Sequence, residues 1–253
     1  MGKGIDSVSM EHSLVIGGTS DIGVWVVESL AKRGHSISIT GRDKQKLSDL
    51  KTKIHSKYNI LIQIYELDIT NMESFNSFYS GLSVEPNHVY ILVGYYEDQT
   101  FARENWRELE KTIQINFTGV VTLVNTISIS MEKRKSGNIT VVSSVAGIRG
   151  RKLNYIYGSA KAGLTTYLSG LRALVFPNGV HISTILLGPV YTKMSLGHNL
   201  IPWLTLTPEE AGEKIVKAGL NKKNEVYIRW PWRFIMFIIQ IIPEWIFKRL
   251  PPF

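Results

Sequence analysis

The chain has 253 residues, of which 44% are apolar and 20% charged, a balance typical of a globular protein with a sizeable core. This composition excludes a disordered tail, a collagen-like fibre and a multi-span membrane protein. The lack of cysteine excludes disulfides, thiolate metal sites and a cysteine nucleophile. The net charge of +8 favours anionic partners, such as phosphorylated cofactors or substrates, an acidic membrane surface or nucleic acid.

Further exclusions come from the amino terminus, the histidines and the basic residues. The segment 1–6 has no apolar run and does not match a myristoylation signal, so we expect a cytoplasmic protein without a secretory leader. The six histidines lack metal-binding spacing, and we expect no metal. Because no recognised basic and aromatic motif accompanies the charge, we expect no nucleic-acid partner.

Short apolar runs alternate with helical patterns along the chain. Strands are expected at 14–17, 37–40, 60–67, 89–93, 139–143, 180–187 and 226–228. Helices are expected at 21–33, 43–56, 72–80, 104–133, 155–176 and 208–219. The alternation predicts one doubly wound α/β Rossmann domain over 1–229, with about seven parallel strands, and an apolar C-terminal extension over 230–253. Ligands of such sheets bind beyond the carboxyl ends of the strands.

A glycine-rich turn follows the first expected strand and opens an apolar helix. It reads Gly17-Gly18-Thr19-Ser20-Asp21-Ile22-Gly23. Glycine lets the backbone approach a pyrophosphate, and the free N–H groups of a helix start favour negative charge. Asp21 stands where the usual pattern has glycine, and it could cap the helix. A tight turn without a ligand is the alternative interpretation.

Charged residues follow the second and third expected strands. Arg42 suits the 2′-phosphate of NADP(H), whereas an acid at this strand end would accept from the ribose of NAD(H). NADP(H) is favoured because 32–57 holds eight Lys and Arg against two acids, while Asp43 leaves NAD(H) open. A solvated basic helix face is the alternative. Asp68 could hold an adenine amino group or cap a helix.

Four polar residues suggest carbonyl chemistry. Tyr157 and Lys161 lie four residues apart, on one helix face, and an ammonium there lowers a tyrosine pKa from about 10 toward working pH. Tyrosine can then exchange a proton with a carbonyl oxygen while nicotinamide exchanges hydride. Ser144, at a strand end, could hydrogen-bond that oxygen. Asn116, an amide in an apolar helix, is a candidate for holding a relay water. An exposed Tyr–Lys pair is the alternative.

Together these residues resemble the short-chain dehydrogenase/reductase family over essentially the whole chain. The glycine-rich turn, Asp68 and the four polar residues come in the family's order and spacing. The resemblance implies an NAD(P)-dependent oxidoreductase with the catalytic tetrad Asn116, Ser144, Tyr157 and Lys161. It also implies that Tyr157 and Lys161 contact the cofactor, with Lys161 on the nicotinamide ribose, and that the protein is a homo-oligomer.

Two segments depart from the family's pattern. The run Leu187-Gly188-Pro189-Val190-Tyr191-Thr192 is similar to the nicotinamide loop, with leucine in place of proline. This likeness implies cofactor contacts from Gly188, Val190 and Thr192. Val93-Gly94-Tyr95-Tyr96 stands where the family has Asn-Asn-Ala-Gly.

The expected substrate is anionic and greasy. Arg149, Arg151 and Lys152 lie between Ser144 and Tyr157, where three cations could pair with a substrate phosphate, a solvated loop being the alternative. In the extension, the uncharged run 234–242 is too short to span a bilayer, which needs about 20 residues. Its flanking Trp, Arg and Lys suit peripheral docking on the inner face of the membrane; packing on the core or on a dimer partner are alternatives.

The 17–23 turn, the Arg-Gly-Arg-Lys loop at 149–152 and the Ile-Pro-x-x-Ile-Phe-Lys-Arg-Leu-Pro ending resemble family members that reduce keto-sugars on polyprenyl phosphate. This implies NAD(P)H-dependent reduction of a lipid-linked 2-keto-sugar in cell-wall precursor synthesis, with a flavin-dependent oxidase supplying the ketone. The alternatives are a reductase of another lipophilic ketone or 3-ketoacyl chain, and a non-catalytic dinucleotide-binding protein.

Overall fold

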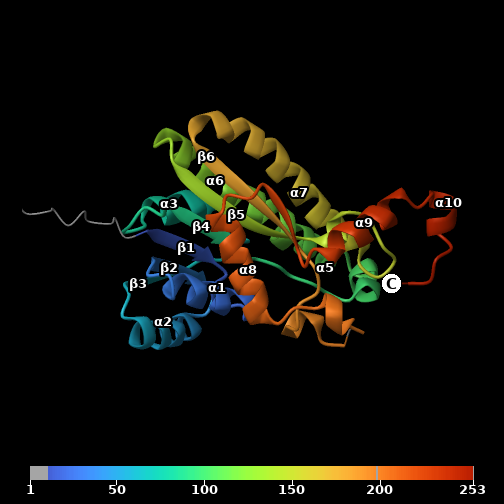
Figure 1. Ribbon diagram of the computed structural model, residues 1–253, viewed down its shortest axis with the longest axis horizontal. Helices are drawn as coiled ribbons and strands as arrows, with labels where there is room; N and C mark the ends of the chain where they lie inside the picture. The colour runs from blue at the N-terminus through green and yellow to red at the C-terminus, as the bar shows by residue number, and fades with distance from the viewer. Residues whose placement is uncertain (1–10, 198, 253) are drawn as a thin grey trace, which may run out of the picture.

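Seven parallel strands form the centre of the fold, in the order β3-β2-β1-β4-β5-β6-β7 (Figure 1). The structure, a computed structural model, describes residues 11–197 and 199–252, so the predicted features of the amino terminus lie outside it. The strands are β1 (His12–Ile16), β2 (Ser36–Gly41), β3 (Ile62–Glu66), β4 (His88–Ile91), β5 (Gly137–Ser144), β6 (Val180–Leu187) and β7 (Glu225–Ile228). The predicted doubly wound sheet is confirmed.

Helices cover both faces of the sheet because its strands are apolar on both sides. In β1, Leu14 and Ile16 pack into one hydrophobic cluster and Val15 into the other, as the alternation of strand side chains requires. One face is covered by α1 (Asp21–Ala31), α2 (Lys44–Tyr58) and α8 (Pro208–Leu220), and the other by α3 (Phe75–Ser80), α6 (Gly119–Lys133) and α7 (Tyr155–Val175).

The helix expected over 104–133 is wrong as a single element. It divides into α5 (Trp106–Ile113), a π-helical turn at Gln114–Thr118, and α6, and a short helix α4 (Gln99–Glu104) precedes it. Side-chain caps begin α4 and α5 separately, at Asp98 and Asn105. By length and composition the run 106–133 could cross a membrane, but half of its most apolar window is buried in the core.

The C-terminal extension forms α9 (Pro231–Ile241) and α10 (Glu244–Phe247) beyond one end of the sheet (Figure 1). Trp232, Met236 and Ile239 are buried against the loops that follow β5 and β6, in one cluster with Val145 and Leu204. Their spacing places them on one side of α9, so that side packs on the domain. The opposite side is exposed.

The order of strands reverses between β1 and β4, and this reversal sets the position of the site. From β1 the chain builds outward to β2 and β3, then returns to β4 and builds outward on the other side. Such a switch opens a crevice beyond the carboxyl ends of the central strands. The glycine-rich turn follows β1, and Ser144 ends β5, so both belong to this edge.

Candidate active site

The turn after β1 keeps several backbone donors free. Gly17 has a φ of 79°, a left-handed conformation that glycine adopts readily. The N–H groups of Thr19, Asp21 and Ile22 have no hydrogen-bond partner within the described part of the chain. A Cβ on Gly23 would lie 2.3 Å from the Gly17 carbonyl oxygen, so only glycine fits there. Free donors at a helix start fit an anionic pyrophosphate.

Asp21 does not cap α1, contrary to one expectation. Ser20 is the cap, because its Oγ accepts from the Gly23 N–H at 3.1 Å. Asp21 is instead the first residue of the helix, and its carboxylate accepts from the Lys193 N–H at 2.8 Å. It therefore ties the turn to the segment that follows β6. Asp21 and that segment border a cavity of about 620 Å³.

The charged residues that follow β2 and β3 differ in whether they have hydrogen-bond partners. Asp43 caps α2, accepting from the N–H groups of Gln45 and Lys46 at 3.0 and 3.1 Å, and these bonds lower its pKa. Arg42 is exposed and makes no hydrogen bond or ion pair within residues 11–197 and 199–252. Asp68 accepts from the N–H and hydroxyl of Thr70 and lies within the electrostatic reach of Arg42. Both carboxylates thus serve local turns, and Arg42 stays available.

Ser144, Tyr157 and Lys161 meet at the carboxyl end of β5. Ser144 ends the strand; its Oγ accepts from the Ala146 N–H at 3.1 Å and donates to the Leu187 carbonyl. The Lys161 Nζ lies 5.8 Å from the centre of the Tyr157 ring, one helical turn away on α7. Lys161 is 2% exposed and donates to the carbonyls of Val93 and Val142, at 3.4 and 3.3 Å. The predicted cluster is therefore assembled in three dimensions.

The pKa values of this cluster differ from the sequence prediction. Burial raises the pKa of Tyr157 to about 12, and the hydrogen bond from Ser144 opposes this only in part. Burial also lowers the pKa of Lys161 to about 8. The expected lowering of the tyrosine pKa is not found, because loss of hydration on burial is the largest influence on the phenol. A phenol of this kind stays protonated at neutral pH, which suits a proton donor.

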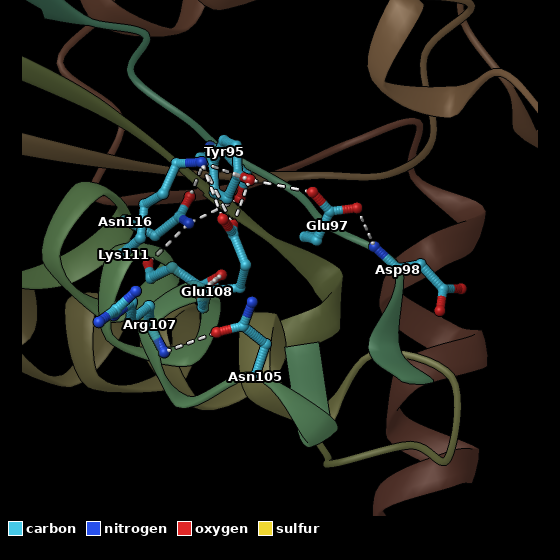
Figure 2. A network of polar contacts seen from close by, with 9 residues as sticks. Tyr95, Glu97, Asp98, Asn105, Arg107, Glu108, Lys111 and Asn116 are labelled. Carbon is cyan, nitrogen blue, oxygen red and sulfur yellow. Dashed lines mark hydrogen bonds and ion pairs between the residues drawn. The ribbon is translucent and has the colours of Figure 1, made fainter. Parts of the chain in front are cut away.

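Asn116 is fully buried in the π-helical turn and holds the segment after β4 (Figure 2). Its Nδ2 donates to the carbonyls of Tyr95 and Thr112 at 2.7 and 2.9 Å, and its Oδ1 accepts from the Tyr95 N–H at 3.1 Å. Both amide hydrogens are thus committed to backbone. A relay water, the predicted role, would have only the second lone pair of Oδ1.

Two tyrosines in the segment that departs from the family's pattern, Tyr95 and Tyr96, belong to the site. The Tyr95 hydroxyl donates to Glu108 at 2.7 Å and accepts from Lys111 at 2.9 Å (Figure 2). Tyr95 is therefore held by its side chain as well as by its backbone. The Tyr96 ring stands edge-on to Tyr157, with centroids 5.6 Å apart, and its hydroxyl donates to the Leu153 carbonyl. The sequence feature that could have identified both tyrosines is their position where the family has Asn-Asn-Ala-Gly.

The loop after β6 is held by the C-terminal extension. A Cβ on Gly188 would lie 2.2 Å from Trp232 Nε1, and that indole donates to the Leu204 carbonyl at 3.1 Å. Val190 forms a bridge with Leu206, and Thr192 caps the short helix at Lys193–Ser195. Of the three predicted nicotinamide-loop residues, Gly188 therefore packs directly against α9, while Val190 and Thr192 are held by contacts within the loop region.

The three predicted substrate cations separate into different roles. Arg149 is committed to the extension: Nη1 donates to the carbonyls of Ile239 and Ile242, both at 2.6 Å, and Nη2 pairs with Glu244 at 2.9 Å. The expectation that it binds substrate phosphate is wrong, because its donors are used by the chain itself. Lys152 donates to the Leu250 carbonyl at 2.6 Å, whereas the buried Nε of Arg151 has no partner among the residues that the structure describes.

The family model for short chain dehydrogenases matches residues 11–199. The chain belongs to the short-chain dehydrogenase/reductase family. An uncharacterized oxidoreductase of Mycobacterium tuberculosis is 28% identical over 250 residues, covering 98% of this chain and 100% of that protein. The 3-oxoacyl-acyl-carrier-protein reductase of Aquifex aeolicus is 28% identical over 186 residues, 72% of this chain and 75% of that protein.

Solved structures share the fold. A short-chain dehydrogenase from Sphingobium yanoikuyae in complex with NADPH superposes with a TM-score of 0.79 at 18% identity, covering 93% of this chain and 97% of that one. This likeness agrees with the predicted fold, and the family match makes the chain an oxidoreductase. Within residues 11–197 and 199–252, no group of three or more His, Asp or Glu side chains could hold a metal ion.

Proposed function

We propose that this protein is an NADPH-dependent carbonyl reductase. The observation that carries the proposal is the cluster of Ser144, Tyr157 and Lys161 beside a glycine-rich turn with free N–H groups. Arg42 has no partner in the described chain and can bind the 2′-phosphate of NADPH, whereas Asp43 is occupied as a helix cap and cannot hold the ribose of NADH. These two observations favour NADPH over NADH. The NADPH bound by the Sphingobium relative supports the same choice.

The chain's own residues would manage the proton and the oxygen. Bound NADPH supplies hydride to the carbonyl carbon. The Ser144 hydroxyl orients the carbonyl oxygen, and Tyr157 donates a proton to it as negative charge develops. The phenolate of a tyrosine with a pKa near 12 is a weaker base than an alkoxide, so the proton moves from Tyr157 to the substrate oxygen. Lys161 then stabilises the phenolate. Asn116 holds the segment at 93–96, whose Val93 carbonyl accepts from Lys161.

We propose a 2-keto-sugar on a polyprenyl phosphate as the substrate. The 17–23 turn, the 149–152 loop and the 242–251 ending resemble decaprenylphosphoryl-2-keto-ribose reductase, which implies a flavin-dependent oxidase as the source of the ketone. The runner-up is a 3-ketoacyl thioester, which the likeness to the Aquifex reductase favours.

Peripheral docking on an anionic membrane would deliver such a lipid. The side of the extension that faces away from the core exposes Phe234, Phe237 and Ile241 by about 60% each, with Trp230 and Trp245 beyond them. Basic residues flank this face, at 233, 248 and 249. Apolar and aromatic side chains bordered by cations suit the interface of a bilayer that contains anionic lipid.

The reaction is tested by following NADPH absorbance with two ketones. We expect oxidation with a polyprenyl-phosphate 2-keto-pentose, the alcohol being identified by mass spectrometry, and little oxidation with acetoacetyl thioester. Turnover of the thioester alone would replace the sugar substrate by the runner-up. If neither ketone supported NADPH oxidation, the proposed reductase activity would be refuted.

Docking is tested by sedimentation with vesicles of phosphatidylcholine and phosphatidylglycerol. The full chain should pellet with them, and the double variant Phe237→Ser/Ile241→Ser should stay in the supernatant while Trp232 keeps the helix in place. Leu174→Ser, at an exposed site on α7, is the matched control. Docking would be refuted if the double variant pelleted as well as the full chain. It would also be refuted if the two substitutions abolished self-association and not vesicle binding.

A further inference from the structure

A second cavity lies outside the catalytic crevice, between α4, the 149–154 loop and the C-terminal extension. Its volume is about 470 Å³. Three stretches far apart in sequence supply its charged walls: Arg103 from α4, Arg151 and Lys152 from the loop, and Glu244 and Lys248 from the extension. The cavity therefore exists only because α10 folds back toward the loop before α7.

The charges around this cavity do not balance. Four of the five charged side chains are cations, and the single acid, Glu244, is paired with Arg149 at 2.9 Å. Within the described residues, the side chains of Arg103 and Lys248 make no hydrogen bond or ion pair. Lys152 donates to the Leu250 carbonyl and keeps its charge. Like charges held together in this way attract an anion.

Arg151 gives the cavity its strongest donor. Its side chain is half-buried, and its Nε is shielded from solvent without a hydrogen-bond partner in residues 11–197 and 199–252. Burial also lowers its pKa. A buried guanidinium N–H without an acceptor is costly, and a phosphate oxygen would satisfy it.

The cavity adjoins the catalytic tyrosine. Tyr155 borders the cavity and begins α7, two residues before Tyr157. Tyr96 links the two places: its ring contacts Tyr157 edge-on, and its hydroxyl lies within the electrostatic reach of Arg151. An anionic group in the cavity and a carbonyl at Tyr157 can therefore belong to one ligand.

We propose that this cavity binds the phosphate of a lipid-linked substrate. The proposal rests on the proposed carbonyl reductase and assigns the anionic part of its substrate to Arg151, Arg103 and Lys248, with Lys152 at the rim. Apolar residues also line the cavity, among them Phe247, Leu250 and Pro251, and these suit the first carbons of a lipid chain rather than a free phosphate. From there the chain can run along the exposed face of α9 and α10.

Direct binding to the full chain, without NADPH, tests this site. The probes are farnesyl phosphate, farnesol and inorganic phosphate, followed by calorimetry. We expect farnesyl phosphate to bind, and Arg151→Gln and Lys248→Gln each to weaken it by about tenfold, the value of one charge-assisted hydrogen bond. Lys217→Gln, which removes an exposed cation on α8, should leave it unchanged. Because Lys248 is exposed, its variant keeps the fold even if Arg151→Gln does not.

Each other outcome overturns the site. Equal binding of farnesol would mean that the phosphate is not recognised, and equally tight inorganic phosphate would make this a site for the free anion. Unchanged affinity in both variants would place the phosphate elsewhere. The proposed function fails separately, through the absence of NADPH oxidation with any ketone, since the binding experiment involves no reduction.

Discussion

Replacing Lys161 by methionine should stabilise the free protein at neutral pH while removing its chemistry. The lysine is 2% exposed, and burial lowers its pKa from 10.5 to about 8. At about 1.4 kcal/mol per pKa unit, holding the proton there costs about 3 kcal/mol. Methionine has a similar volume and no charge, but it gives up two long hydrogen bonds, worth about 1 kcal/mol each. The variant should gain about 1 kcal/mol at pH 7.

The difference should reverse as the pH rises. Below pH 8 the lysine is protonated in both the folded and the unfolded chain, so the full cost of burial is present. Between pH 8 and 10.5 the folded chain has released its proton and the unfolded chain still holds it, so the wild-type protein gains stability with pH. The variant cannot gain, and by pH 10 it should be the less stable of the two.

Urea unfolding followed by tryptophan fluorescence measures this difference. Wild type and Lys161→Met are compared at pH 7, 8.5 and 10, with Lys217→Met as an exposed control whose difference from wild type should not vary. The reasoning is refuted if the difference between wild type and Lys161→Met is the same at pH 7 and pH 10.

Three other substitutions probe the cofactor edge and the extension. Arg42→Ala should weaken NADPH about tenfold more than NADH in fluorescence titrations, since it removes one charge-assisted contact; an equal loss would end its 2′-phosphate role. Asp21→Asn should tighten NADPH about threefold, because a negative charge beside the free N–H groups is removed while an amide oxygen still accepts from Lys193; weaker binding would contradict this. Arg149→Gln should lower the free energy of unfolding by about 2 kcal/mol and speed proteolysis of the tail, as backbone carbonyls lose a donor; an unchanged cleavage rate would argue against its anchoring role.

The sequence predicted the strands well because apolar runs flanked by turns leave few other choices. The run at 180–187 matches β6 at both ends, and the family's spacing located Ser144, Tyr157 and Lys161. The interruption at Asn116 was not predictable, since α5 and α6 read as one helix by periodicity. The π-helical turn carries Asn116, whose side chain contacts the Tyr95 backbone twenty-one residues earlier in the chain, a contact that periodicity does not reveal.

Charges were harder to assign than elements. Asp21 and Arg149 are polar residues at expected sites, yet each is engaged by backbone groups that only the tertiary fold brings near. The pKa of Tyr157 likewise depends on how deeply the pair is buried, which spacing on a helix does not reveal. Sequence therefore located the candidate site residues, while their ionisation and partners required the structure.

The central claim is that the Tyr157 phenol is the proton donor, and Tyr157→Phe tests it most directly. Phenylalanine keeps the ring that packs edge-on against Tyr96 and removes only the hydroxyl. With a ketone that the wild-type protein reduces, kcat should fall by about a thousandfold, within the range of general acid catalysis, while the Kd for NADPH stays within about threefold. Wild-type turnover by Tyr157→Phe would contradict the account.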